Sequence, residues 1–363
     1  MREIDFGSIG KEVCGKQNII YGAGYNGKAL YGLLYDKSVS VEAFYDDDRS
    51  RWGDLCCGRK ILSESELLSM DRKDTNIFIS SMYVGQIAAK VQKMGFLNVF
   101  VALDILLKKD TDYFQFRKYG SDTNYIDRLN CLVEASCDKQ TKSYFELIKK
   151  TVLHGKALRD IMDLYCGEKQ YFLNCFKGKL NGINFLDAGA YTGDTVREIL
   201  EEGIYPAGVY CFEADYDNYS KLKVFKDKEG GRINLVCENY ALWDCRTRLG
   251  MKLSNYNARV DLECRETSVE TVTIDDYFRD IKVGFIKMDI EGAERKALAG
   301  GMKTIERDRP ILAVFIYHGL DDMVEIPEML MGRLEDYSFL VRHHSYTYSE
   351  TILYGAPKEL GIF

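Results

Sequence analysis

Short apolar runs alternate with amphipathic segments in two stretches of this 363-residue chain, and no other feature constrains its fold as strongly. In the first stretch, from about 18 to 106, the runs are NIIYGAG, VEAFYDDD, NIFISS and NVFVAL. In the second, from 183 onward, they are NFLDAGAYTGDT, GVYCFEAD, INLVCENYALWD, GFIKMDIEG and ILAVFIYHG. Strands that alternate with helices indicate βαβ units and parallel sheets. Each stretch should therefore form its own α/β domain.

The chain divides into three parts on this pattern. Residues 108–182 carry apolar residues at helical spacing without strand signals, so we expect a helical connector there. The last two apolar runs, YSFLVRHH and ETILYGAP, are separated by a short polar stretch and predict an antiparallel hairpin. Five parallel-type strands followed by this hairpin predict a seven-stranded α/β sheet. The expected domains are thus 1–107 and 183–363, on either side of the connector.

Charge and composition narrow the choice of partners and compartment. The net charge is −7 and no Lys/Arg-rich run is present, so the field of the protein would repel a nucleic acid. The N-terminus has no signal-peptide pattern and no run of about 18 apolar residues occurs, so we expect a cytoplasmic protein without a membrane span. The eleven cysteines form no C-x-x-C pair, which argues against zinc ribbons and thioredoxin-like chemistry.

A glycine-containing turn follows the first strand of the second stretch. In the segment Asp187–Thr195, glycines at 189 and 193 permit a tight turn and let a ligand approach the main chain. Glu213 ends the next strand, twenty residues after the second glycine, and could accept both hydroxyls of a ribose. Tight turns and a solvated glutamate would explain these two features equally well. Three later segments favour the ligand site: Asn239–Asp244, Ile286–Glu294 and Arg309–Val314.

The most specific of these segments is FIKMDIEGAERKALAGG at 285–301. This segment is the most specific part of a resemblance between residues 184–357 and the FkbM family of methyltransferases. The resemblance implies the class I methyltransferase fold, S-adenosylmethionine as cofactor and O-methylation of a hydroxyl, often on a sugar or a glycosylated metabolite. Tyr191-Thr192 stands where many members carry Asn-Ile or Asn-Val, but the glycine spacing is kept.

The resemblance also implies roles for individual residues. The glycine loop would line the methionine and ribose of the cofactor, Glu213 would take the ribose hydroxyls, and Asn239 to Ala241 would border the adenine. Asp289 and Glu291 would face the reacting end. The implied cofactor-binding residues are Asp187, Gly189, Tyr191, Gly193, Thr195, Glu213, Asn239, Tyr240, Ala241 and Asp289.

Methyl transfer to a hydroxyl needs alignment of the oxygen and help with its proton. Three of the four histidines, His318, His343 and His344, fall at expected strand ends or in the hairpin loop. We predict His318 as general base, with Asp289 and His343 as catalytic neighbours, although an ordinary core or surface histidine is the usual finding for any one of them. A divalent-metal site of Asp289, Glu291 and His318 stays open but is not favoured, because no ligand spacing is diagnostic.

The first stretch carries a glycine motif of its own. Gly22, Gly24 and Gly27 lie between a strand and a helix, and Asp46 lies nineteen residues further on, as in the dinucleotide fingerprint. Taken literally, this pattern predicts a nicotinamide-dependent oxidoreductase. However, the unit ends after about four strands, without a second dinucleotide-binding half or an evident catalytic partner.

The segment YDDDRSRWGDLCCGRKILSESEL gives the first stretch a second interpretation. Residues 18–103 resemble the N-terminal domain of bacterial sugar acetyltransferases. This implies a Rossmann-like domain that binds a sugar nucleotide, with a phosphate at the helix start. A purely structural Rossmann-like cap is an equally good explanation.

The sequence as a whole favours an S-adenosylmethionine-dependent O-methyltransferase that modifies a sugar, a glycan or a glycosylated metabolite. Its acceptor would be a small molecule or glycan, as in bacterial carbohydrate modification. A nicotinamide-dependent oxidoreductase and a non-catalytic sugar-nucleotide-binding protein are the alternatives.

Overall fold

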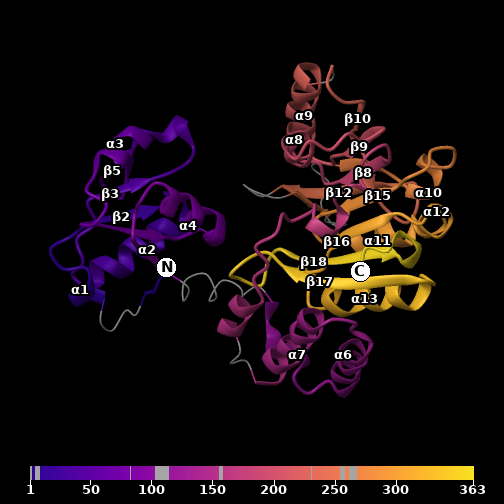
Figure 1. Cartoon of the computed structure of the whole chain (residues 1–363), viewed down its shortest axis with the longest axis horizontal. Coiled ribbons are helices and arrows are strands. Elements are labelled where there is room, and N and C mark those ends of the chain that lie inside the picture. The colour runs from indigo at the N-terminus through magenta and orange to yellow at the C-terminus, as the bar shows by residue number, and fades with distance from the viewer. Residues whose placement is uncertain are drawn as a thin grey trace. The chain divides into compact units, whose positions relative to one another are not determined.

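The computed structural model describes residues 2–4, 9–81, 83–102, 114–154, 158–229, 231–253, 258–260 and 268–363. The chain forms two compact units, which we describe separately (Figure 1). Unit 1 comprises Met1–Lys118, His154–Gly167 and Ser345–Ser349, and unit 2 comprises Tyr119–Leu153, Glu168–His344 and Glu350–Phe363. The segment expected as a connector is therefore divided between the two units.

Unit 1 is built on a seven-stranded sheet in the order β1-β7-β6-β2-β3-β5-β4. All neighbours pair in parallel except β4 and β5. The central strands are buried along nearly their whole length, as expected for a parallel sheet covered on both faces. The strands are β1 (Arg2–Glu3), β2 (Gln17–Tyr21), β3 (Ala43–Tyr45), β4 (Leu55–Cys56), β5 (Arg59–Leu62), β6 (Thr75–Ile79) and β7 (Asn98–Val101).

Helical segments complete unit 1. The helix α2, which follows the glycine motif, begins after Gly24 and buries Leu30 and Leu34 against the sheet. The helices are α1 (Ile9–Glu12), α2 (Tyr25–Asp36), α3 (Glu64–Ser69) and α4 (Val84–Lys93), and the 3-10 turns are η1 (Arg49–Arg51), η2 (Phe116–Tyr119, ending in unit 2) and η3 (Leu158–Leu164).

Unit 2 contains the second seven-stranded sheet, in the order β10-β9-β8-β15-β16-β18-β17. The first five strands are parallel, and β18 is antiparallel to both of its neighbours. This confirms the predicted sheet of five parallel strands and a hairpin. The strands are β8 (Asn184–Ala188), β9 (Gly208–Phe212), β10 (Leu235–Glu238), β15 (Phe285–Met288), β16 (Ile311–Phe315), β17 (Tyr337–His343) and β18 (Thr351–Pro357).

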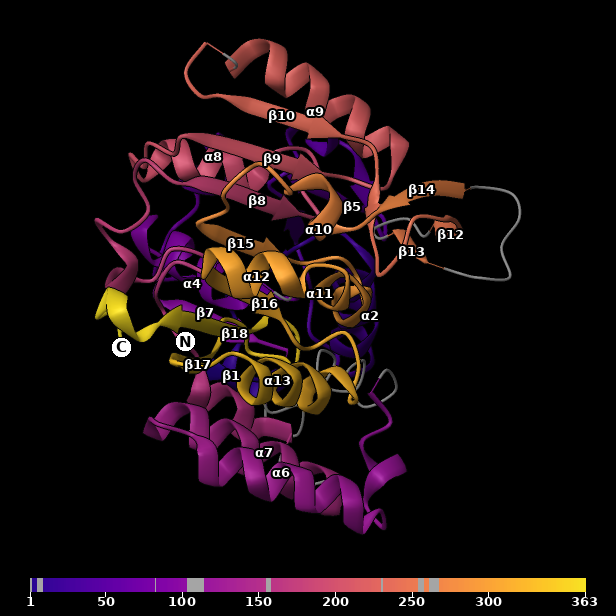
Figure 2. The same ribbon diagram turned by 90° about the vertical axis from the view of Figure 1, so that its right-hand side faces the viewer.

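A small additional sheet of unit 2 was not expected from the sequence. Its order is β11-β14-β12-β13, and Figure 2 shows it to one side of the main sheet. Its strands are β11 (Ala241–Leu242), β12 (Arg248–Leu253), β13 (Ala258–Val260) and β14 (Ser268–Val272). Two of these four strands are only two or three residues long, too short to give a clear period-2 pattern in the sequence.

The helices of unit 2 follow its strands, and two further helices precede them. Tyr125 in α6 donates to the carbonyl of Leu320, and Arg128 in α6 makes three hydrogen bonds to Glu328 of α13, so α6 packs on α13. The helices are α6 (Thr123–Ala135), α7 (Lys139–His154), α8 (Asp194–Glu201), α9 (Tyr216–Glu229), α10 (Ile274–Tyr277), α11 (Glu294–Ala299), α12 (Met302–Asp308) and α13 (Asp322–Arg333), with 3-10 turns η4 (Asn174–Phe176) and η5 (Lys358–Leu360).

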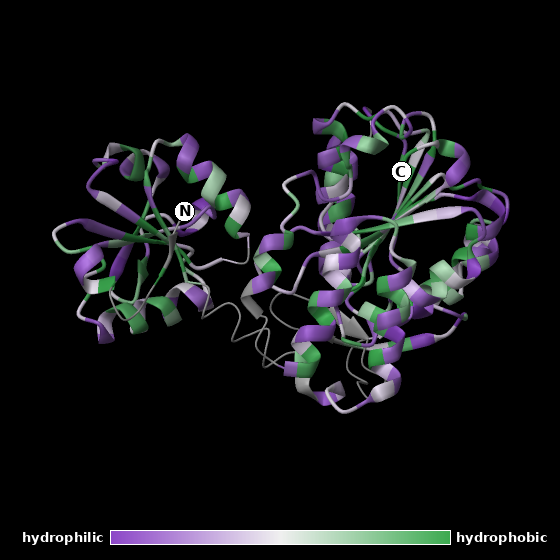
Figure 3. Ribbon diagram, turned by 60° about the horizontal axis from the view of Figure 1, so that its bottom comes forward, coloured by the Kyte–Doolittle hydropathy of each residue, from purple (hydrophilic) through white to green (hydrophobic). Residues whose placement is uncertain are grey.

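The core of unit 2 is aromatic and extends beyond the predicted domain start. Phe285 on β15 packs with its ring centroid 4.8 Å from that of Phe185 and 6.1 Å from that of Phe172. Tyr171, Phe172 and Phe176 are all buried, and they belong to the segment expected as connector. In Figure 3 the central strands are mostly green, whereas the helices are banded in green and purple, as expected for amphipathic helices around such a core. None of the described helices is long and apolar enough to span a membrane.

Candidate functional site

The loop after β8 can be formed only with glycines at two positions. Gly189 has φ +80°, and a Cβ on it would lie 1.8 Å from the carbonyl oxygen of Asp289. Gly193 has φ +90°, and its Cβ would lie 2.7 Å from the ring of Phe225. The amides of Gly189 and Ala190 both donate to the carbonyl of Phe212. The loop therefore packs between the ends of β9 and β15, in the tight turn that the glycine spacing predicted.

Glu213 at the end of β9 fastens this loop. Its Oε2 accepts the amide of Tyr191 at 2.7 Å and its Oε1 accepts the amide of Asp215 at 2.8 Å. The side chain of Asn239 donates to the carbonyl of Glu213 at 2.8 Å and so holds the strand end. Burial raises the pKa of Glu213 to about 7, against these hydrogen bonds and the charge of Lys287. The glycine loop, the strand-end acid and Asn239 thus lie together. Tyr240 and Ala241 follow directly, half-buried and buried.

Asp187 and Thr195 lie beneath the loop rather than on it. Both are about 2% exposed or less, and Thr195 Oγ1 donates to Asp187 Oδ1 at 3.4 Å. The same oxygen lies 3.2 Å from Nζ of Lys287. The resemblance implied that Asp187 and Thr195 line the cofactor. Their burial and mutual contacts support the loop from below, and their contact with the cofactor stays a prediction.

A second group of side chains follows β15 and β16. Asp289 and Glu291 come directly after β15, Glu294 begins α11, and His318 follows β16. His318 Nε2 lies 3.4 Å from Asp289 Oδ1 and 3.8 Å from Glu291 Oε2. On the other side of the ring, Nδ1 lies 3.0 Å from Glu294 Oε1. The structure therefore brings together the predicted Asp289, Glu291 and His318, with Glu294 as an additional partner.

The carboxylates decide the charge of this histidine. Burial alone would lower the pKa of His318, but Glu294, Asp289 and Glu291 raise it to about 9. Burial raises the pKa of Asp289 to about 7, opposed by the charges of Lys287 and His318. At neutral pH His318 is therefore an imidazolium. The sequence-based expectation of a neutral histidine base needs the other protonation state, and Asp289 is the group whose pKa suits proton acceptance near pH 7.

Glu350 is a half-buried acid beside this cluster that the sequence did not single out. Its Oε1 lies 3.5 Å from the hydroxyl of Tyr317, and its Oε2 accepts from the side-chain amide of Gln170. Burial raises the pKa of Glu350, although Gln170 and the charge of His318 oppose the shift. No motif marks these residues, because Gln170 lies in the expected connector and Glu350 in the hairpin loop.

Glu294 and Lys287 were missed for a different reason. Both lie inside the motif stretch FIKMDIEGAE, yet neither was assigned a role. A lysine in the middle of an apolar strand is itself a signal, since a buried ammonium must find partners.

His343 has a separate environment in the closing hairpin. It is 1% exposed, and its Nδ1 lies 2.8 Å from the hydroxyl of Thr351. The neighbouring His344 is joined through Nε2 to the hydroxyl of Tyr354 at 2.9 Å. These hydroxyl contacts belong to the β17–β18 hairpin, whereas His318 is held by carboxylates.

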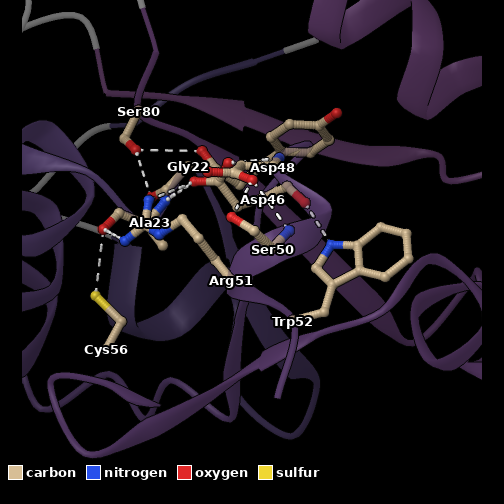
Figure 4. Close-up of polar contacts among 10 residues, drawn as sticks. Gly22, Ala23, Asp46, Asp48, Ser50, Arg51, Trp52, Cys56 and Ser80 are labelled. Carbon is tan, nitrogen blue, oxygen red and sulfur yellow. Dashed lines mark hydrogen bonds and ion pairs between the residues drawn. The ribbon is translucent and has the colours of Figure 1, made fainter. Parts of the chain in front are cut away.

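The glycine motif of unit 1 forms a second candidate site (Figure 4). A Cβ on Gly27 would lie 1.9 Å from the carbonyl oxygen of Gly22, so α2 packs directly on the turn. Asp46 Oδ2 accepts the amide of Ala23 at 2.8 Å. Gly24 is the N-cap of α2 and provides no side-chain cap. The predicted Gly22, Gly24, Gly27 and Asp46 thus lie around one turn.

An arginine distinguishes this turn from the one in unit 2. Arg51 Nη1 lies 3.1 Å from Asp46 Oδ2, and its Nη2 donates to the carbonyl of Ala23 at 2.9 Å. Asp46 also accepts the amide of Asp48, just as Glu213 accepts that of Asp215. The two turns therefore share their acid–amide geometry, but in unit 1 a cation neutralises the acid.

The chain matches one protein family and is similar to solved structures of other proteins. Residues 187–348 match the family model of the methyltransferase FkbM domain, which confirms the resemblance seen in the sequence. The crystal structure of methyltransferase FkbM from Methylobacillus flagellatus KT is similar over 95% of this chain and 92% of that chain, with 20% identity and a TM-score of 0.54. An rRNA methylase from Streptococcus thermophilus is similar over 49% of this chain and 87% of its own, with 13% identity and a TM-score of 0.34. No curated protein matches the chain.

The charge state of His318 can be tested directly. In a heteronuclear NMR titration, we expect one of the four imidazoles to stay protonated at pH 7 and to titrate near pH 9. Its signal should vanish in His318→Gln. Glu294→Gln should lower this pKa because it removes the largest raising charge, whereas replacing the exposed Glu201 should leave it unchanged. A His318 pKa at or below 6.5 in the unaltered protein would contradict the conclusion that the surrounding carboxylates keep this imidazole charged.

Proposed function

We propose that the FkbM methyltransferase domain of this chain, residues 187–348, transfers a methyl group from S-adenosylmethionine to a hydroxyl of a sugar, a glycan or a glycosylated metabolite. The family match supports methyl transfer. The observation that carries the proposal is that a glycine loop with a buried acid and a carboxylate–histidine cluster follow neighbouring parallel strands. In open α/β sheets, ligands bind beyond these carboxyl ends.

The residues around the glycine loop fit this donor. A Cβ at Gly189 or Gly193 would collide with the Asp289 carbonyl or the Phe225 ring, so only glycine lets the loop take the shape that would receive the donor. Each oxygen of Glu213 accepts one amide and keeps a further acceptor position for a ribose hydroxyl. Asn239, Tyr240 and Ala241 would border the adenine. S-Adenosylmethionine supplies the methyl group on a sulfonium, and the protein aligns the accepting oxygen with it.

Asp289 is the proton acceptor in this proposal. The hydroxyl of the acceptor loses its proton as it bonds to the methyl carbon, and Asp289 takes that proton. The imidazolium of His318, 3.4 Å away, stabilises the carboxylate of Asp289, while Glu294 fixes the ring from its other nitrogen. His343 lies outside this step because Thr351 holds its Nδ1 in the hairpin.

The same side chains also suit a divalent metal. The contact with Glu294 leaves Nε2 of His318 directed at Asp289 and Glu291, an arrangement that many histidine ligands of metals share. A metal would then lower the pKa of the acceptor hydroxyl instead of Asp289 accepting its proton. Loss of activity in a chelator, restored by Mg²⁺ or Mn²⁺, would favour this alternative.

Replacement of Glu213 tests donor binding. Isothermal calorimetry with S-adenosylhomocysteine should show that Glu213→Ala weakens binding by about 1.5–3 kcal/mol, the worth of hydrogen bonds to a charged group. Glu201→Ala removes an exposed acid of α8 and should bind as the unaltered protein does. Equal affinity of Glu213→Ala and the unaltered protein would remove this acid from the donor site.

The pH profile tests proton transfer. Because Asp289 must be ionised, kcat should rise with pH through about 7, and Asp289→Asn should lower kcat about 10²–10⁴-fold. His318→Gln removes a cation that lowers the pKa of Asp289, so its profile should move to higher pH. A rise near pH 9 that disappears in His318→Gln would instead make the histidine the base.

For unit 1 we propose a sugar nucleotide as ligand. The turn at Gly22–Gly27 and the partly exposed Arg51 support this, since an arginine beside backbone amides suits a phosphate. Nicotinamide-dependent oxidation is the alternative that the same turn raises.

Fluorescence separates these ligands. The chain has two tryptophans, and Trp52 donates to the carbonyl of Asp46, so Trp243→Phe leaves a reporter at the turn. UDP-sugars should change this fluorescence, NAD should not, and no sugar nucleotide should support NADH oxidation. Arg51→Gln should abolish the UDP-sugar response, and Arg59→Gln, at an exposed position, should retain it. A response to NAD alone, or NADH turnover, would favour the oxidoreductase.

A further inference from the structure

Lys287 is a charged residue in the middle of the central strand of unit 2. It lies opposite Asp187 of β8 on one side and Ala313 of β16 on the other, and it is 2% exposed. An ammonium buried in this way has lost its hydration and must be paired and hydrogen-bonded. Its Nζ lies 3.2 Å from Asp187 Oδ1 and donates to the carbonyls of Gly189 at 2.6 Å and Ala188 at 3.3 Å. The three N–H groups of the Lys287 ammonium thus have three oxygen acceptors.

The shortest of these contacts reaches the glycine loop. The amides of Gly189 and Ala190 are held by the carbonyl of Phe212, and the amide of Tyr191 by Glu213, so β9 fixes the donors of the loop. Lys287 holds the Gly189 carbonyl from β15, on the opposite side. The peptide between Gly189 and Ala190 is therefore fixed at both its carbonyl and its amide.

We propose that Lys287 is a positioning residue for the methyl donor, which acts by fixing the Gly189 carbonyl and thereby the shape of the glycine loop. This inference rests on the proposed function, because the loop matters only if it binds the donor. Stability alone does not explain why a lysine stands here, because a buried ion pair can often be replaced by apolar side chains without loss of stability. The hydrogen bond to Gly189 is what an apolar pair cannot replace.

The experiment compares four proteins: the unaltered chain, Asp187→Asn, Lys287→Met and the double variant. Lys287→Met leaves Asp187 buried without its cation and should lower stability, so this variant alone is not decisive. The double variant removes both charges and should recover most of that stability. Asp187→Asn removes the carboxylate but keeps the hydrogen bond from the Lys287 ammonium to the Gly189 carbonyl. Stability is followed by thermal melting, and binding of S-adenosylhomocysteine by calorimetry.

We expect the double variant to bind S-adenosylhomocysteine at least about tenfold more weakly than Asp187→Asn, because it lacks a charge-assisted hydrogen bond that shapes the loop. KM for the donor should rise, while KM for the acceptor should change little. Lys358→Met, at an exposed lysine of the same unit, should match the unaltered protein in every measurement.

The outcomes separate this inference from the proposed function. If the unaltered chain does not bind S-adenosylhomocysteine, the proposed function fails. If it does bind, and the folded double variant binds as tightly as Asp187→Asn, Lys287 has no positioning role. Recovery of stability without recovery of donor affinity supports the inference, because a purely structural pair would restore both.

Discussion

Parallel pairing of β8 with β15 and of β15 with β16 is the constraint on which the rest of unit 2 depends. The register sets Lys287 beside Asp187, and the strands then end with Gly189, Asp289 and His318 at one edge. The close approach of Gly189 to the Asp289 carbonyl joins the two halves of the candidate site, because it leaves no room for a side chain between them. A shift of one residue in this register would separate all of these contacts.

Acidic side chains outnumber basic ones at this edge of the sheet. Asp289, Glu291, Glu294 and Glu350 are gathered around the single imidazole of His318, and Glu213 adds a further buried acid nearby. Such a surrounding favours a cation. The proposed donor carries a positive sulfonium before transfer, and the product is a neutral thioether. The same acids that assist proton transfer would therefore help to distinguish donor from product, by charge rather than shape.

Much of this arrangement could be predicted from sequence, and the missing parts have physical reasons. The strands, the glycine turn and the strand-end acid are local patterns, so Gly189, Gly193 and Glu213 could be identified directly. The charge of His318 could not, because it depends on Glu294, which packs against the ring from a neighbouring helix. Asp187 was expected on the ligand and lies beneath the loop, since its partner Lys287 is a hundred residues away in the chain. Gln170 and Glu350 meet only in three dimensions.

The aromatic segment before β8 determines where unit 2 can be separated from the rest of the chain. Tyr171, Phe172 and Phe176 fill the core on which β15 rests, and Ser345–Ser349, within the closing hairpin, belong to unit 1. A gene fragment cut at the start of the family match would lack part of its own interior. The boundary of sequence similarity is thus not a boundary of folding, and this domain is poorly suited to exchange between proteins as an independent module.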